Sequence, residues 1–267
     1  TLLNIIAGFL KPDVGDILVA LPNGTTKSVV QNPDIVKTRI GFSTQTPSFY
    51  PRLTVRENME HFARLYGLNE LDLRSRCNSL LGLVGLSQAK DVIAAHLSGG
   101  MQKRLDIACA LIHDPAILIL DEPTADLDPV LRKQLWELIR QINAKGTTIL
   151  LASHFLAEIE LLCSRIAVLQ NGRIIEHGTA DQLRNLYSKE FEVYVQTSDH
   201  RRLLAELNRS KRFWSKASIV NDELVVQTAN PESMLSFLAS RVKHGELHSV
   251  HVARPTLGKV FEQLVKR

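Results

Sequence analysis

The spacing of apolar residues divides the N-terminal two thirds of the chain into helical and strand-like segments. Residues 101–113 repeat apolar side chains at i, i+3, i+4 and i+7, the pattern of a helix with one buried face. Residues 117–120 and 147–152 form short, largely apolar runs, as expected of parallel strands buried on both faces. Helical segments follow both runs, so the spacing predicts an α/β domain.

Two smaller regions accompany these strands. Residues 17–30 contain short apolar stretches around Asn23-Gly24, which predicts a small antiparallel β unit. Residues 50–113 predict a helical subdomain, whose first helix begins where Thr54 and Glu57 have capping-box spacing.

The last part of the chain has a different order of elements. We predict strands at about 191–196, 214–220, 223–228 and 246–253, and helices at about 199–208, 231–243 and 256–266. Apart from the final helix, this is the β-α-β-β-α-β order of the ferredoxin-like arrangement. We therefore expect two domains, residues 1–187 and a smaller α+β domain at 188–267.

Composition and charge exclude several classes of protein. The chain has 267 residues, of which 45% are hydrophobic and 22% charged, so wholesale disorder is excluded. The longest apolar run, residues 107–112, is far shorter than the roughly 20 residues of a membrane-spanning helix. We expect no membrane span and no secretory leader. The net charge of +4 is small, and a solvated surface explains it.

Polar residues that can carry chemistry follow the ends of the predicted strands. Gln45 follows a strand at 40–44, Asp121 and Glu122 follow the first buried run, and His154 follows the second. Ligands bind at the carboxyl ends of strands in open α/β sheets. Asp121 and Gln45 offer the oxygen ligands that Mg²⁺ prefers, and a carboxylate such as Glu122 can accept a proton from water. A neutral His154 imidazole can donate a hydrogen bond to phosphate.

A possible anion site lies at the start of the helix at 101–113. Ser98 can cap this helix, and Gly99 and Gly100 leave the backbone N–H groups at its positive end open to an anion. Each of these features alone is more common as a capped turn or a surface residue. Their occurrence in one chain, in this order and each at the end of an element, favours a functional site.

These motifs resemble those of the nucleotide-binding domain of ABC-type ATPases, over residues 1 to about 180. The segment 97–101 (LSGGM) is similar to the signature motif, 117–122 to the Walker B strand, and 125–128 (ADLD) to the D-loop. Gln45 and His154 match the Q-loop and switch residues, and Thr1 matches a position just after the Walker A phosphate loop.

The resemblance implies an ATPase with ATP and Mg²⁺ as its ligands. Glu122 is then the catalytic base, and Asp121 holds the Mg²⁺ shell. Gln45 senses metal and attacking water, and His154 steadies the γ-phosphate. The resemblance also implies a second nucleotide-binding domain, with two copies or near-copies pairing head to tail around ATP. The nucleotide-contacting positions in this pairing are Thr1, Ser98, Gly99, Gly100 and Asp126.

The sequence departs from the family pattern in two places. The glycines, Lys and hydroxyl of the phosphate loop would lie before residue 1, so we expect a chain truncated at its N-terminus that is inactive alone. Met101 replaces the Gln that is usual at the fifth signature position, which affects a ribose-side contact rather than the phosphate contacts.

A transporter of this family needs a separate transmembrane permease subunit, so the resemblance implies a peripheral location on the cytoplasmic face of the membrane. The segment 254–264 is similar to the tail of type-2 exporter ATPases, although Gly258 and Lys259 stand where that tail commonly has two acidic residues. The alternative is a soluble ABC-type ATPase acting on nucleic acid or another cytosolic partner. Residues 46–96 are too few for the long coiled coil of such proteins, and we expect no nucleic-acid partner.

Overall fold

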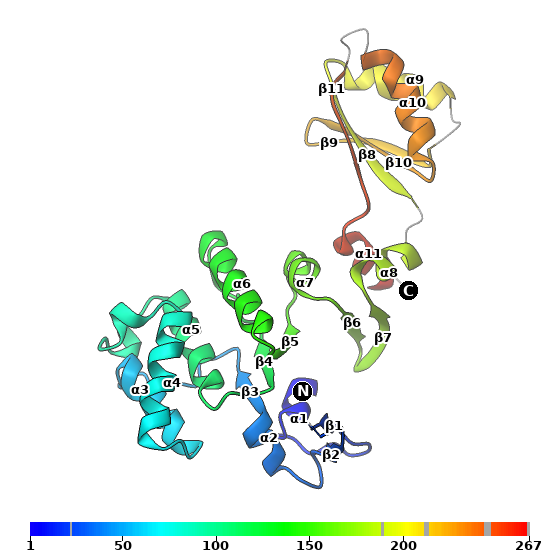
Figure 1. Cartoon of the computed structure of the whole chain (residues 1–267). Helices are drawn as coiled ribbons and strands as arrows, with labels where there is room; N and C mark the ends of the chain where they lie inside the picture. The colour runs from blue at the N-terminus through cyan, green and yellow to red at the C-terminus, as the bar shows by residue number, and fades with distance from the viewer. Residues whose placement is uncertain (22, 188–189, 211–213, 243–246, 266–267) are drawn as a thin grey trace. The chain divides into compact units, whose positions relative to one another are not determined.

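The computed structural model describes residues 1–21, 23–187, 190–210, 214–242 and 247–265 (Figure 1). The chain divides into two compact units, residues 1–158 and 159–267, and each has its own apolar core. The predicted domain boundary between 187 and 188 falls at residues 188–189, which lie outside the described residues, and it stays a prediction. No helix within the described ranges is long and apolar enough to cross a bilayer.

A parallel sheet of order β3-β4-β5 lies at the centre of the first unit. Its strands are Ile40–Ser43, Ile117–Asp121 and Thr148–Ala152, close to the predicted ranges. Leu120 in β4 is opposite Ser43 in β3 and Leu151 in β5, so all three strands end at the same edge. The apolar run in β4 is buried because the strand is covered on both faces.

Different elements cover the two faces of this sheet. Ile40 and Ile119 belong to a core cluster with Val19 of the small β unit and with Ala7 and Val29, which directly follow the first helix and the second strand of that unit. These elements are α1 (Leu2–Ile6), β1 (Leu18–Ala20), β2 (Thr26–Ser28) and α2 (Asp34–Arg39). Helix α2 was not predicted from the sequence, because it has too few residues to show helical periodicity.

Helix α5 (Gly99–Leu111) packs against the other face of the sheet. The contact is closest at Gly41 in β3, where an added Cβ atom would lie 2.2 Å from the carbonyl oxygen of Ala110. Glycine is therefore required at this position. The α5 helix joins the helical subdomain, which also contains α3 (Val55–Leu65), α4 (Glu70–Leu83) and the short turns η1 (Ser87–Ala89) and η2 (Ala94–His96).

Side-chain caps define where the main helices begin. The Thr54 hydroxyl accepts from Glu57 N at 3.1 Å and the Glu57 carboxylate accepts from Thr54 N at 2.8 Å, so the predicted capping box is confirmed. Asp128 caps α6 (Pro129–Ala144) by accepting from Val130 N and Leu131 N.

The second unit begins within α7 (Leu156–Leu162). Its hairpin joins β6 (Ile166–Gln170) and β7 (Arg173–Gly178), and Asn171 and Gly172 at the turn have φ values of 49° and 75°. The following β-α-β-β-α-β order agrees with the prediction, and its antiparallel sheet has the order β11-β8-β10-β9. The elements from α8 onward are α8 (Ala180–Tyr187), β8 (Phe191–Thr197), α9 (His200–Ser210), β9 (Lys216–Val220), β10 (Glu223–Thr228), α10 (Pro231–Val242), β11 (Leu247–Ala253) and α11 (Leu257–Val265).

A buried carboxylate explains one departure from the exporter-like tail. Glu192 in β8 is almost fully buried, and it accepts hydrogen bonds from Lys259 of α11, from the Tyr194 hydroxyl at 2.7 Å and from Gln227 at 3.3 Å. Burial raises the pKa of Glu192, but these hydrogen bonds outweigh burial and the net pKa is lowered. A cation at position 259 thus compensates for the buried charge, which an acidic residue could not do.

We predict that Lys259→Met lowers the free energy of unfolding by about 1–3 kcal/mol at pH 7, because Glu192 then loses its charged partner. The pKa of Glu192 is lowered in the folded state. The ion pair therefore stabilises the fold fully above the unfolded-state pKa near 4.5, and this stabilisation is lost as pH falls through the folded-state pKa. Denaturant unfolding at several pH values measures this. Adding Glu192→Gln to Lys259→Met should restore much of the lost free energy of unfolding. If Lys259→Met alone left the free energy of unfolding unchanged at pH 7, the role of the pair would be contradicted.

A second prediction concerns the contact between α5 and the sheet. Gly41→Ala should lower the free energy of unfolding by about 1–3 kcal/mol, because backbone atoms must move to admit the methyl group. Gly82→Ala in α4 is the matched control, since nothing lies within 4 Å of its added Cβ atom. The control should be neutral or stabilising by about 0.5–1 kcal/mol. Equal thermal stability of the two variants would contradict the close approach.

Candidate active site

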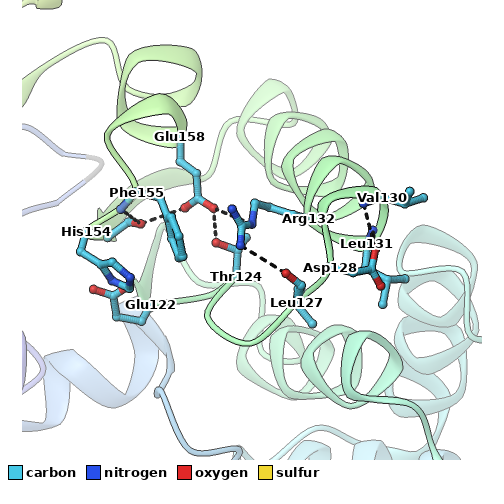
Figure 2. Close-up of polar contacts among 11 residues, drawn as sticks. Glu122, Thr124, Leu127, Asp128, Val130, Leu131, Arg132, His154, Phe155 and Glu158 are labelled. Atoms are coloured by element: carbon cyan, nitrogen blue, oxygen red, sulfur yellow. Dashed lines mark hydrogen bonds and ion pairs between the residues drawn. The ribbon is translucent and has the colours of Figure 1, made fainter. Parts of the chain in front are cut away.

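Two of the predicted residues meet at the carboxyl ends of β4 and β5. Asp121 is opposite Ala152, and the backbone N–H of Glu122 donates to the Ala152 carbonyl at 2.9 Å. The His154 ring then reaches back, so that its Nδ1 lies 2.8 Å from Oε2 of Glu122 (Figure 2). His154 is exposed and Glu122 is partly buried, so the pair is open to solvent on one side.

The backbone around this pair adopts an uncommon conformation. Glu122 and Asp126 have φ values of 47° and 64°, in the left-handed region that favours glycine. Such residues cost about 1–3 kcal/mol each and cluster at functional sites. The fold therefore fixes the loop between β4 and α6 in a shape that local preferences do not favour.

A fully buried carboxylate, Glu158, is hydrogen-bonded to this loop (Figure 2). Glu158 accepts hydrogen bonds from the hydroxyl of Thr124, two residues after Glu122, and from the hydroxyl of Ser153 at 2.9 Å. Because Ser153 directly precedes His154, one carboxylate anchors both segments that carry the Glu122–His154 pair.

Arg132 of α6 completes this anchor. Its guanidinium donates to the Leu127 carbonyl at 3.2 Å, lies 3.8 Å from the Glu158 carboxylate and covers the Phe155 ring at 4.0 Å. None of these supporting residues was predicted from the sequence. A single acidic residue in a short helix gives no sequence pattern that distinguishes a buried Glu158 from a solvated one.

Asp121 and Gln45 have the chemistry of a magnesium site. Asp121 ends β4 and is partly buried, and Gln45 is exposed two residues beyond the end of β3, at the same sheet edge. Within the described ranges there is no group of three or more His, Cys, Asp or Glu residues that could hold a metal by themselves. Two oxygen donors fit Mg²⁺, which is usually held by one or two carboxylates together with water and substrate phosphates.

The remaining predicted residues stand on other elements. Ser98 is the N-cap of α5 and accepts from Met101 N at 3.4 Å, and Gly99 is exposed with open space around it. Gly100, by contrast, is buried, and an added Cβ atom there would lie 3.2 Å from the Leu131 side chain of α6. Thr1 is exposed ahead of α1. Among the described residues, neither this turn, Thr1 nor Gln45 has a hydrogen bond to Glu122 or His154.

The chain is similar in sequence and in fold to known proteins. The family model described as "ABC transporter" matches residues 1–125. Nod factor export ATP-binding protein I of Sinorhizobium fredii (strain NBRC 101917 / NGR234) is 41% identical over 178 residues, which cover 67% of this chain and 50% of that protein. Linearmycin resistance ATP-binding protein LnrL of Bacillus subtilis (strain 168) is 31% identical over the whole of this chain and 86% of its own length.

This chain belongs to the ABC transporter family. A solved dimeric ATP-binding cassette in a post-hydrolysis state with ADP and Pi is 26% identical, with a TM-score of 0.57 over 67% of this chain and 78% of that one. The predicted α/β fold of an ABC ATPase domain is therefore confirmed, while ATP hydrolysis by the whole protein stays a proposal. The chain spans only about half the length of the Nod factor export relative. The roles of single residues stay predictions.

A third prediction concerns Glu158, the buried carboxylate that supports the loops of the ABC-type site. Glu158→Gln should lower the free energy of unfolding by about 1–3 kcal/mol, because the amide cannot accept from both hydroxyls and also balance Arg132. Glu137→Gln on the exposed surface of α6 is the control and should change stability by less than about 0.5 kcal/mol. Denaturant unfolding compares the two. Equal stability of both variants would show that Glu158 is not held as described.

Proposed function

We propose that the chain is the ATP-hydrolysing part of an ABC exporter and that Glu122 and His154 form its hydrolytic centre. The observation that carries this proposal is the 2.8 Å contact between the two side chains at the strand edge where ligands of open α/β sheets bind. A phosphate and a water molecule would approach this pair from its solvent-open side.

Glu122 acts as the general base. Its Oε2 contacts His154, while the other carboxylate oxygen remains able to accept a hydrogen bond from an attacking water. The left-handed backbone at Glu122 directs this side chain from a fixed turn, and the Thr124–Glu158 hydrogen bond keeps the turn in place.

His154 orients Glu122 and contacts the phosphate. If Nδ1 carries the proton that is shared with the Glu122 carboxylate, the neutral ring has only an acceptor at Nε2. It can then donate to a phosphate oxygen in one of two ways, either as the doubly protonated imidazolium or after it leaves Glu122. The contact between the two residues therefore suits a resting state that ATP binding rearranges.

Asp121 and Gln45 would hold the magnesium ion together with phosphate oxygens. When bound, Mg²⁺ neutralises phosphate charge and polarises the scissile group. Asp121 supplies a carboxylate from the end of the central strand, and Gln45 supplies an amide oxygen from an exposed loop. Thr1, at the start of α1, matches a position just after the Walker A phosphate loop of the family.

Pairing of two such domains would complete the site. The N-terminus of α5 has a capping Ser98, and an added Cβ atom at Gly99 would meet nothing within 4 Å, so the phosphate of a partner domain could approach the N–H groups there. Asp126, in the strained loop beside Glu122, would contact the partner. The similar dimeric cassette with ADP and Pi supports this arrangement.

Export through a separate permease is supported by the names of the relatives, one a Nod factor export protein and the other a linearmycin resistance protein. We infer a peripheral position at the cytoplasmic face of the membrane through that permease. The alternative, an ABC-type ATPase acting on nucleic acid, has no comparable observation in its favour.

The test is Glu122→Gln in the full-length protein. We predict that this variant still binds ATP while turnover falls by about 10²–10⁴-fold, the usual loss for a general base. Glu137→Gln, which changes an exposed carboxylate on α6, should keep wild-type turnover. Nucleotide binding and phosphate release are measured on both variants. Turnover near the wild-type value in Glu122→Gln would remove Glu122 from this role.

A further inference from the structure

A second buried carboxylate, Asp106, fixes the loop that carries Gln45. Asp106 is in α5 and is 1% exposed. Its Oδ2 accepts from the hydroxyl of Ser43 at 2.6 Å, and its Oδ1 accepts from both N–H and hydroxyl of Ser48, at 2.8 and 2.9 Å. Ser43 and Ser48 stand on either side of Gln45, so one carboxylate holds both ends of the loop.

Lys103, one turn earlier in α5, holds the same loop by a different bond. Its side chain is also buried, and Nζ donates to the carbonyl of Thr44 at 2.7 Å while lying 4.0 Å from Asp106. Burial lowers the pKa of the Lys103 ammonium, and the neighbouring Asp106 carboxylate acts in the opposite direction. All these bonds leave Gln45 itself exposed.

Packing alone does not require this arrangement. A buried ion pair costs desolvation energy, and apolar residues of similar volume often stabilise a protein equally well or better. What the ionic groups add is direction, because each hydrogen bond fixes one atom of the loop relative to the helix. Asp106 lies seven residues after Gly99, or about 10 Å along the helix axis.

We propose that Lys103 and Asp106 are positioning residues that lock the Gln45 loop to the signature helix α5, so that the two move together. This inference rests on the proposed function, in which Gln45 meets the metal of its own site while the N-terminus of α5 meets the phosphate of the partner's site. Occupancy of one site would then set the position of the helix that serves the other. Lys103 and Asp106 thereby couple the two nucleotide sites of the dimer.

The test is made in full-length protein that also carries Glu122→Gln, in which bound ATP persists. Asp106→Asn keeps the size of the side chain but removes its charge, and Ser48→Ala is a milder second variant in case the first fails to fold. We expect each to leave ATP affinity of the monomer within about twofold, measured with a fluorescent nucleotide. Dimerisation driven by Mg-ATP, measured by sedimentation, should weaken by about tenfold for Asp106→Asn and by less for Ser48→Ala.

Two controls separate coupling from general damage to the helix. Arg76→Met removes the hydrogen bonds to Leu111 and Ile112 at the other end of α5, and it should destabilise the fold without weakening dimerisation. Combining Asp106→Asn with Gln45→Ala should cost no more dimerisation than Gln45→Ala alone, because both act through the same loop.

Additive losses in the double variant, or dimerisation unaffected by Asp106→Asn, would overturn the coupling while leaving the proposed function intact. A protein with unsubstituted Asp106 and Gln45 that neither binds ATP nor dimerises with it would instead refute the proposed function, and the coupling with it.

Discussion

The Glu122–His154 contact depends on one constraint, the parallel pairing of β4 with β5. In that register the two strands end level with each other, so residues that follow them are adjacent although 32 positions separate them in the chain. The apolar residues of β4 make this possible, because they are buried on both faces and fix the strand at the centre of the sheet.

Buried carboxylates hold the loops that the sheet positions. Glu158 binds the segments before α6 and after β5, and Asp106 binds the segment after β3. Each accepts hydrogen bonds on both oxygens and faces a cation, Arg132 or Lys103, as a charge buried in a protein requires. His154 is thus exposed and Glu122 partly exposed, while the two supporting carboxylates lie in the interior.

The sequence was informative where a residue's role follows from local pattern. The strands, the Thr54–Glu57 capping box and the succession of elements in the second unit follow from periodicity and turn chemistry, which are local properties. It was also predicted that Glu122 and His154 each follow a buried strand, and the two side chains are close because those strands are neighbours in the sheet. The supports could not be predicted, because whether Glu158 or Asp106 is buried depends on packing between distant segments. Likewise, the burial of Gly100 depends on Leu131 of another helix.

In the proposed function, Glu122 and His154 contact the phosphate and its attacking water. The most direct measurement is a crystal structure of the full-length protein with ADP, Mg²⁺ and vanadate, which mimics the phosphate during transfer. We expect the Glu122 carboxylate about 3 Å from the apical oxygen and the His154 ring about 3 Å from an equatorial oxygen. Vanadate bound with both side chains well beyond hydrogen-bonding distance would contradict the account.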